Sequence, residues 1–335
     1  VVLYVRTPEG EWNGAAGYAK LETSVPMTPT HRHYAASVTK MYTAAAVMLL
    51  VEDGCIGLDE RISTYLPRSV YGRVPNGDRA TVRQLLGHTS GIPDFSGDLA
   101  YDLDTLNDPL REFSTDDLLS YLEGQSAFCS PGSCYFYSNS NYFLLALLVD
   151  HVVALPEIPG DSHADVISTR ILQPLGLDAT YYRNEEGYPS PPGLVNSYHD
   201  LFGDDRLVNV SDIAVHVNGT YFGNTGLIAA AADYAGFIEA LLSGGIVGEE
   251  LVAEMVTTTK SRYYGLGLSL AETSYGTGIG HDGGDLGVLS EVRYFPDSDA
   301  TIVLLVNGGN DGITDRLFRL LRDEVRSAVL SVPGP

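Results

Sequence analysis

The residues Ala36-Ser37-Val38-Thr39-Lys40 begin a largely apolar run that continues through residues 41–51 and reaches Gly54. Good helix formers dominate this run, proline is absent, and the glycine stands where a C-terminal cap is expected. Because the run is apolar nearly all round, it predicts a helix that is buried between other elements. We interpret the rest of the chain as organised around this helix.

Ser37 falls in the first turn of the predicted helix, where backbone N–H groups lack partners and the helix dipole favours negative charge. Lys40 lies one turn later on the same face. A hydroxyl beside an amine and free N–H donors has the components of an acyl-transfer nucleophile. An ordinary N-cap serine is the alternative. The chain has only three lysines, and burying an ammonium is costly without a purpose, which favours catalysis.

The composition bounds the class of protein. A chain of 335 residues, 44% of them hydrophobic, suits a soluble globular protein that forms two lobes. No apolar run reaches the roughly 18 residues of a membrane span. A net charge of −23 argues against nucleic acid or an anionic membrane as partner. The expected partner is therefore a small-molecule or peptide substrate, while the oligomeric state stays open.

Cysteine and histidine usage gives two further expectations. Cys129 and Cys134 flank a Ser-Pro-Gly-Ser turn that could bring the two sulfurs together, although two free thiols are equally compatible with the spacing. A disulfide would indicate an oxidising compartment, so an extracytoplasmic or secreted location is expected. His31 and His33 lack a third ligand, and we predict no metal site.

Strand patterns lie at both ends of the chain and helical patterns lie between them. This order predicts an α/β lobe from residues 1–60 and 218–335, and an inserted, mainly helical lobe from residues 61–217, with the active site in the cleft between them. Strands are expected at residues 1–6, 14–20, 264–270, 288–295 and 301–306. Helices are expected at residues 81–88, 141–153, 230–243 and 314–329, the last with an apolar stripe of Leu317, Leu320, Leu321 and Val325.

A loop before the second strongly apolar helix carries a tyrosine and an asparagine. Tyr137 lies near Lys40 in this hypothesis, and an adjacent ammonium would make its proton easier to lose. The phenol could then exchange a proton with Ser37. Asn139 offers a donor and an acceptor for an amide or for the lysine. The alternative is a polar turn with a core tyrosine, because the chain has 21 tyrosines.

A third stretch, residues 280–287, combines glycines with a histidine before a strand: Gly280-His281-Asp282-Gly283-Gly284-Asp285-Leu286-Gly287. Glycine inside a strand pattern marks a place where another backbone or a ligand approaches closely. The bare N–H of Gly284 could be a second oxyanion donor, opposite the Ser37 N–H. A plain β-hairpin or a weak cation-binding loop is the alternative.

The order Ser-x-x-Lys, Tyr-x-Asn and His-x-Gly resembles the serine β-lactamases and penicillin-binding proteins. The likeness is closest to class C β-lactamases, D-alanyl-D-alanine carboxypeptidases, D-aminopeptidases and related esterases, and it covers nearly the whole chain. It implies the β-lactamase-like (DD-peptidase) fold, an α/β plus all-α architecture with an antiparallel sheet, flanking helices and an inserted helical lobe. It implies no cofactor. Further similar segments are Leu85-Leu86-Gly87-His88-Thr89-Ser90-Gly91-Ile92, Pro131-Gly132 and Tyr264-Gly265-Leu266-Gly267-Leu268.

The resemblance also implies residue roles. Ser37 would attack the carbonyl and become acylated. Lys40 and Tyr137 would move its proton to the leaving group and then activate water. Asn139 would bind the amide of the acyl side chain. The strand wall of the cleft would bind substrate through His281, Gly283 and the Gly284 N–H.

The chain departs from carboxypeptidases of this family at two positions. These enzymes hold a substrate carboxylate with a hydroxyl after the histidine and an arginine on the preceding strand, where this chain has Asp282 and Ser269. An acid there repels a carboxylate, so a neutral ester, an amide or an amine-bearing substrate is expected. In the alternative arrangement Asp282 turns away and Arg262 or Arg293 reaches in.

The favoured function is a serine acyl hydrolase that acts through an acyl-enzyme on a small amide, D-peptide, ester or β-lactam. An alternative is a penicillin-binding sensor that acylates and turns over poorly. Transfer of the acyl group to an amine instead of water is a further option. The motifs keep every catalytic group, which favours the enzyme.

Overall fold

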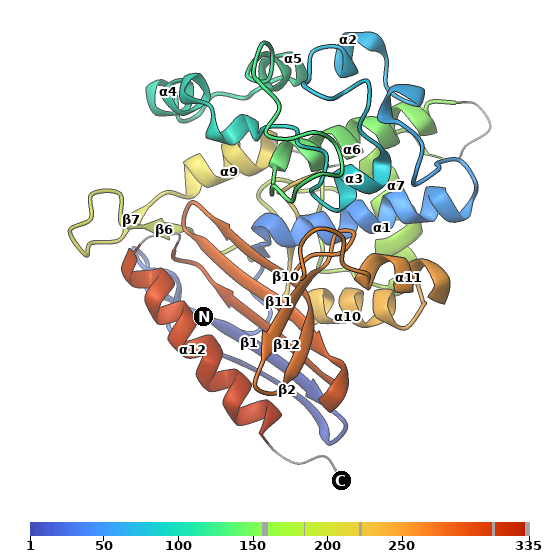
Figure 1. Cartoon of the computed structure of the whole chain (residues 1–335). Coiled ribbons are helices and arrows are strands. Elements are labelled where there is room, and N and C mark those ends of the chain that lie inside the picture. The colour runs from blue at the N-terminus through green and yellow to red at the C-terminus, as the bar shows by residue number, and fades with distance from the viewer. Residues whose placement is uncertain (156–159, 184, 221–222, 310–311, 332–335) are drawn as a thin grey trace.

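A computed structural model (Figure 1) describes residues 1–155, 160–183, 185–220, 223–309 and 312–331. Its centre is a six-stranded antiparallel sheet with the order β2-β1-β12-β11-β10-β9. The strands are β1 (Val2–Thr7), β2 (Gly10–Ala15), β9 (Ser269–Thr273), β10 (Gly276–Asp285), β11 (Val288–Phe295) and β12 (Ala300–Val306). The two ends of the chain therefore build one sheet.

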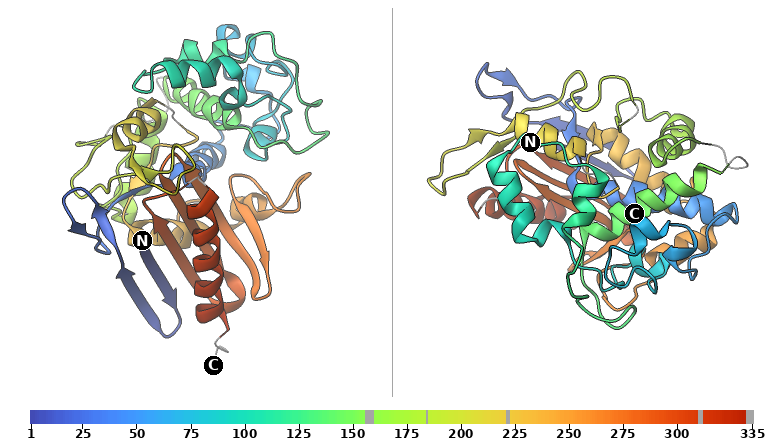
Figure 2. Two further views of the ribbon diagram at one scale, coloured as in Figure 1. Left: turned by 90° about the vertical axis from the view of Figure 1, so that its left-hand side faces the viewer. Right: turned by 90° about the horizontal axis from the view of Figure 1, so that it is seen from above.

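Two helices cover opposite faces of this sheet (Figures 1 and 2). Helix α10 (Ala231–Leu242) contacts β1, β11 and β12, and α12 (Gly312–Leu330) lies along the other face. Because side chains alternate along a strand, neighbouring residues of β11 face different helices. Val292 belongs to the main apolar core, whereas Glu291 hydrogen-bonds Arg326 of α12.

The central helix α1 (Thr39–Glu52) follows a single 3-10 turn, η1 (Ala36–Val38), and contacts α6 (Asn139–Val153) and α7 (His163–Ile167). Every residue from Thr39 to Leu50 is buried, which confirms the prediction of a helix enclosed on all sides. Tyr42 stacks on Phe237 of α10 with ring centroids 3.6 Å apart, so α1 also anchors the layer that covers the sheet.

The middle of the chain supplies most of the remaining helices, and the described residues also form three small two-stranded sheets. The helices are α2 (Arg68–Tyr71), α3 (Val82–Leu86), α4 (Leu99–Asn107), α5 (Thr115–Ser120), α8 (Gln173–Leu175), α9 (Ser211–Thr220) and α11 (Glu249–Val256). Shorter helical turns are η2 (Ile62–Thr64), η3 (Phe95–Gly97), the π-helical η4 (Ser168–Leu172) and η5 (Pro296–Ser298). The small sheets pair β3 (Tyr18–Lys20) with β4 (Val25–Pro26), β5 (His33–Tyr34) with β8 (Ile228–Ala229) and β6 (Tyr198–His199) with β7 (Val208–Asn209).

The predicted fold class is confirmed, and three local predictions differ from the structure. The first hairpin turns earlier than expected, since β2 ends at Ala15. The strand expected at residues 264–270 begins only at Ser269. In α12 the predicted apolar stripe is mostly exposed: Val325 is buried, but Leu317, Leu320 and Leu321 are 59%, 56% and 37% exposed. The helix instead turns arginines toward the sheet.

The lobe boundaries at residues 60/61 and 217/218 stay predictions. Cys129 and Cys134 form a disulfide, which decides between the two alternatives that their spacing left open. Across the described ranges, none of the helices has the length and apolar character that crossing a membrane requires.

Candidate active site

The nucleophile position is built by the turn that precedes α1. Ala36 adopts a positive φ of 47°, a conformation that costs a non-glycine residue about 1–3 kcal/mol and is found mainly at functional sites. Ala35 fixes the turn, since its N–H donates to the Leu227 carbonyl at 2.9 Å and its own carbonyl accepts from Ser290 Oγ at 2.9 Å. Ser37 stands half-buried at the tip of this constrained turn.

Lys40 is fully buried and faces three neutral oxygens. Its Nζ donates to Ser37 Oγ at 3.0 Å, to Asn139 Oδ1 at 2.8 Å and to the Asn224 carbonyl at 3.0 Å. Burial lowers the pKa of this amine to about 7, although the carboxylates of Asp94 and Asp285 partly oppose that shift. When the amine loses its proton, the hydrogen bond to Ser37 can reverse, so that the hydroxyl donates to nitrogen.

Tyr137 completes the group around the hydroxyl. Its phenol hydrogen-bonds the Ser37 side chain, and Lys40 Nζ lies 5.0 Å from the centre of its ring. Burial raises the pKa of Tyr137 above that of a free phenol, and this effect outweighs the hydrogen bond from Ser37. The expectation that the neighbouring amine would lower this pKa is therefore wrong, and Tyr137 is a neutral phenol that can relay a proton.

His88 holds the loop that carries Tyr137. Its ring packs against the tyrosine ring with centroids 4.2 Å apart. The Ser138 N–H donates to His88 Nδ1 at 3.2 Å, and Asn141 Nδ2 lies 3.1 Å from the same atom. Because Nδ1 accepts, the imidazole proton lies on Nε2, and burial keeps the pKa of His88 well below its ordinary value. A neutral histidine thus fixes the backbone between Tyr137 and Asn139.

Asn139 begins α6 and is oriented from both sides. Its backbone N–H and its side-chain Nδ2 both donate to Asp94 Oδ2 at 3.1 Å. Since the amide nitrogen is held by a carboxylate, its oxygen must point to Lys40. Asp94 in turn accepts from the Ser96 N–H and hydroxyl through Oδ1, so both of its oxygens have partners.

Strand β10 approaches the nucleophile turn very closely. A Cβ on Gly283 would lie 2.2 Å from the Ala35 carbonyl oxygen and 2.3 Å from Ser290 Oγ, so only glycine fits. This confirms the prediction that glycine marks a close approach of another backbone. Strand β9 pairs with β10 only as far as Gly280, which leaves the edge at Gly284 without a neighbouring strand among the described residues.

A cavity of about 210 Å³ opens beside Ser37. Predicted site residues Asn139 and Gly284 line it together with the serine. The other lining residues are Ala36, Phe95, Ser96, Tyr101, Asn224, Thr225 and Asp285. The candidate nucleophile, a candidate oxyanion donor and a candidate amide-binding side chain therefore share one space.

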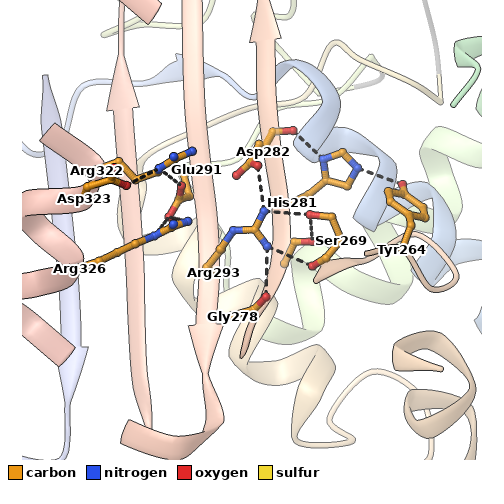
Figure 3. Close-up of polar contacts among 11 residues, drawn as sticks. Tyr264, Ser269, Gly278, His281, Asp282, Glu291, Arg293, Arg322, Asp323 and Arg326 are labelled. Carbon is orange, nitrogen blue, oxygen red and sulfur yellow. Dashed lines mark hydrogen bonds and ion pairs between the residues drawn. The ribbon is translucent and has the colours of Figure 1, made fainter. Parts of the chain in front are cut away.

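His281 supports the cavity from behind and does not line it. Its Nδ1 lies 2.6 Å from the Asp282 carbonyl and its Nε2 lies 3.0 Å from the Tyr264 hydroxyl (Figure 3). Burial lowers the pKa of His281 to about 4, so the ring is neutral near pH 7. Nδ1–H then donates to the carbonyl and Nε2 accepts from the phenol.

Asp282 and Ser269 do not line the cavity: Asp282 lies beside residues of α12, and Arg293 links it to Ser269 on β9 (Figure 3). Asp282 pairs with Arg293 at 2.9 Å, and the same guanidinium donates to the Ser269 hydroxyl at 3.0 Å. Burial alone would raise the pKa of Asp282, but Arg293 outweighs it and the pKa is lowered. The prediction that Asp282 and Ser269 bind substrate in the cleft is therefore wrong, since neither lines the cavity. The alternative, in which Asp282 turns away, holds for Asp282 alone: Arg293 is 2% exposed and does not reach the cavity, and Arg262 is an exposed residue outside it.

Two cavity residues were missed by the sequence reasoning and carry polar groups. Asp285 belongs to the glycine-rich stretch that was quoted for other residues, and its charge was the overlooked signal. Asn224 lies between Gly223 and Gly226, which have φ of 83° and 103°. A polar residue in a loop bounded by such glycines is a usable signal of a built site.

Among the described residues there is no cluster of three histidine, cysteine, aspartate or glutamate side chains that could hold a metal ion.

The sequence profile of the Beta-lactamase family matches residues 1–325. The chain belongs to this family. Among its relatives is Penicillin-binding protein 4 of Amycolatopsis lactamdurans, 29% identical over 329 residues that cover 93% of this chain and 81% of that protein. Penicillin-binding protein 4* of Bacillus subtilis is 26% identical over 307 residues, and the matched part covers 88% of this chain but only 65% of the relative.

Solved structures show the same fold. A D-stereospecific amidohydrolase from Streptomyces sp. matches with a TM-score of 0.80 and 25% identity, covering 95% of this chain and 92% of the other. The D-amino acid amidase from Ochrobactrum anthropi SV3, complexed with L-phenylalanine amide, matches with a TM-score of 0.78 and 24% identity, covering 98% and 93%. This family consists of penicillin-recognising serine hydrolases, among them penicillin-binding proteins and amidases.

Proposed function

We propose that the protein is a serine hydrolase that cleaves a small amide, D-peptide, ester or β-lactam through an acyl-enzyme on Ser37. The supporting observation is the 3.0 Å contact between Lys40 Nζ and Ser37 Oγ at the edge of the cavity. An amine with a pKa near 7 and no carboxylate partner in contact is matched to taking a proton at neutral pH.

In the first step neutral Lys40 accepts the Ser37 proton while the oxygen attacks the substrate carbonyl. The N–H groups of Ser37 and Gly284 stabilise the oxyanion, and the loss of one such donor costs about 10²–10³ in rate in other enzymes. Tyr137, a neutral phenol, passes a proton to the leaving group and is reprotonated through the Ser37–Lys40 pair. Asn139 holds Lys40 through Oδ1, and the second lone pair of this oxygen can accept an N–H of the acyl side chain.

In the second step a water molecule replaces the leaving group. Lys40, neutral again, takes one proton from this water while the water oxygen attacks the acyl carbon. The ester bond to Ser37 then breaks, the Ser37 oxygen receives that proton from Lys40 directly or through the Tyr137 phenol, and the acid product leaves. The relatives named amidases and penicillin-binding proteins support an amide or peptide as the acyl donor.

Hydrolysis of a p-nitrophenyl ester by the wild type and by Ser37→Ala tests this function. We expect turnover to fall on the order of 10⁴-fold or more, since removing a nucleophile leaves only binding and oxyanion stabilisation. Ser190→Ala, at an exposed serine, is the matched control. Retention of turnover by Ser37→Ala would refute the proposal.

Mass spectrometry after mixing with a β-lactam separates the enzyme from the sensor alternative. An enzyme releases the acyl group, whereas a stable adduct without ester turnover would indicate a sensor. Supplying an amine during ester turnover would reveal acyl transfer, because an amide product would form.

We also propose an extracytoplasmic location. The Cys129–Cys134 disulfide supports it, because such bonds persist mainly in oxidising compartments. Fractionation of producing cells, followed by detection of the protein, tests this.

A further inference from the structure

The cavity beside Ser37 contains one carboxylate that the catalytic groups do not use. Asp285 follows Gly284 at the end of β10, is half-buried, and lines the cavity together with the nucleophile. Its Oδ1 accepts from the Leu286 N–H at 2.8 Å, while its Oδ2 accepts no hydrogen bond from the described residues. Among those residues no cation lies close enough to Asp285 to form an ion pair.

The other carboxylate near Lys40 differs in this respect. Both carboxylate oxygens of Asp94 accept hydrogen bonds, one from Ser96 and the other from Asn139. Asp94 therefore has a structural role, because it orients Asn139. Asp285 holds no catalytic residue in place. A half-buried carboxylate with a spare oxygen is costly to keep unless something binds to it.

A second polar group of the cavity is also unsatisfied. Asn224 is 5% exposed and lines the cavity, and its Oδ1 is buried without a hydrogen-bond partner. The backbone carbonyl of Asn224 already accepts a hydrogen bond from Lys40 Nζ. The cavity therefore offers one free acceptor, a carboxylate oxygen of Asp285, and the amide oxygen of Asn224 is buried in its wall without a partner. Phe95 and Tyr101 are its aromatic walls.

We propose that Asp285, assisted by Asn224, forms a subsite for a positively charged ammonium group of the substrate. An ammonium brings three N–H donors and a charge that complements the carboxylate, whereas a substrate carboxylate would be repelled. The aromatic walls suit an apolar group attached to the same carbon skeleton. The substrate class is thus an acyl donor with a free amine near its reactive carbonyl.

This assignment rests on the proposed function, because it takes the cavity beside Ser37 to be the substrate site. It also replaces the sequence argument based on Asp282, whose carboxylate is neutralised by Arg293 under α12. The preference for an amine-bearing substrate then depends on a different acid, four residues from His281.

The test is the affinity of benzylamine, a cation at pH 7, compared with benzyl alcohol, its neutral counterpart, by titration calorimetry at low salt. We expect the wild type to bind the cation at least about tenfold more tightly. Asp285→Asn should reduce that ratio to within about threefold, and Asp285→Glu, which keeps the charge, should retain part of it. Asp297→Asn, an exposed acid in the turn at the opposite end of β11, is the matched control and should keep the wild-type ratio.

A kinetic comparison gives a second readout. The ratio of kcat/KM for phenylalanine p-nitroanilide to that for its N-acetyl derivative, measured for both enantiomers, should fall at least about tenfold in Asp285→Asn. Equal affinity of the wild type for cation and alcohol, including no measurable binding of either, would overturn the subsite, as would an unchanged ratio in Asp285→Asn.

The two proposals fail in different ways. Ester turnover that depends on Ser37 without any preference for the cation overturns only the ammonium subsite. Ester turnover that survives Ser37→Ala overturns the catalytic function, and a cation preference that still depends on Asp285 would then mark a binding site without the proposed chemistry. Melting temperatures of the variants and of the wild type show whether a variant that loses the preference for the cation is still folded. If Asp285→Asn is unstable, Asp285→Glu provides the folded comparison.

Discussion

Buried cations lie on both sides of strand β10, and they differ in the charge of the groups that they contact. On the face toward η1, Lys40 contacts only neutral oxygens, from Ser37, Asn139 and Asn224. On the face toward α12, each buried guanidinium has a carboxylate: Arg293 lies 2.9 Å from Asp282, and Arg326 lies 2.8 Å from Glu291 (Figure 3).

The difference shows how one sheet supports both chemistry and rigidity. Neutral acceptors hydrogen-bond a buried ammonium but do not neutralise its charge. Burial therefore lowers the pKa of Lys40 to about 7, and the amine can give up its proton near neutral pH. A guanidinium paired with a carboxylate keeps its proton and fixes one packing arrangement. The face with unpaired Lys40 is the one that we propose to be catalytic, and the face with matched pairs attaches α12.

Removing the transferable proton site has the largest expected effect. In Lys40→Met the side chain keeps its length but cannot act as a base, and we expect kcat/KM to fall by about 10³-fold or more. Lys260→Met, at an exposed lysine, should leave kcat/KM unchanged. Steady-state ester hydrolysis measures this, and a loss below tenfold would show that Tyr137 alone takes the proton.

Breaking a matched pair on the other face should act on stability rather than on chemistry. Arg326→Leu leaves Glu291 buried with Arg322 at 3.7 Å as its nearest cation, and we expect the free energy of unfolding to fall by about 3–5 kcal/mol. The double variant Glu291→Leu/Arg326→Leu removes both charges and should recover most of that loss. Urea unfolding of the single and double variants measures both, and equal losses in the two would contradict pairing as the cause.

The smallest expected effect is a shift in the pH dependence of kcat/KM, which follows from the pKa of Lys40. Because the pKa of Lys40 is lowered to about 7, the amine is protonated and inactive below that value and neutral above it, so kcat/KM should rise with pH through about 7. The carboxylate of Asp94 raises this pKa. Asp94→Asn should therefore move the rise to lower pH, by less than about one unit. A shift to higher pH would contradict the sign of this interaction.

The contacts that could be predicted from the sequence are those that follow from the spacing of residues within one helix or strand. Ser37 and Lys40 are one helical turn apart, so their meeting follows from the helix alone. The close approach at Gly283 was also accessible, since glycine within a strand has few other reasons to be there. Tyr137 and Asn139 could be assigned only through the resemblance, because their positions depend on the packing of α6 against α1.

What depends on burial and on strand parity was not predicted. The pKa of Tyr137 is raised because the phenol is enclosed, and enclosure cannot be read from a loop sequence. Asp282 faces α12 because it follows His281, whose ring faces Tyr264, and successive side chains point to opposite sides. The leucine stripe of α12 is exposed because the buried Glu291 requires the arginines of that helix.

The pairing of Val2 with Leu305 has a consequence for how the molecule is made. During synthesis β1 and β2 leave the ribosome before the helical segments that follow them, but β12, which must lie beside β1, emerges only after those segments. Until then the N-terminal hairpin presents an open edge, and the wall opposite Ser37 does not exist. The nascent chain therefore carries Ser37, the proposed nucleophile, without the glycine edge of β10 until that strand has also been made.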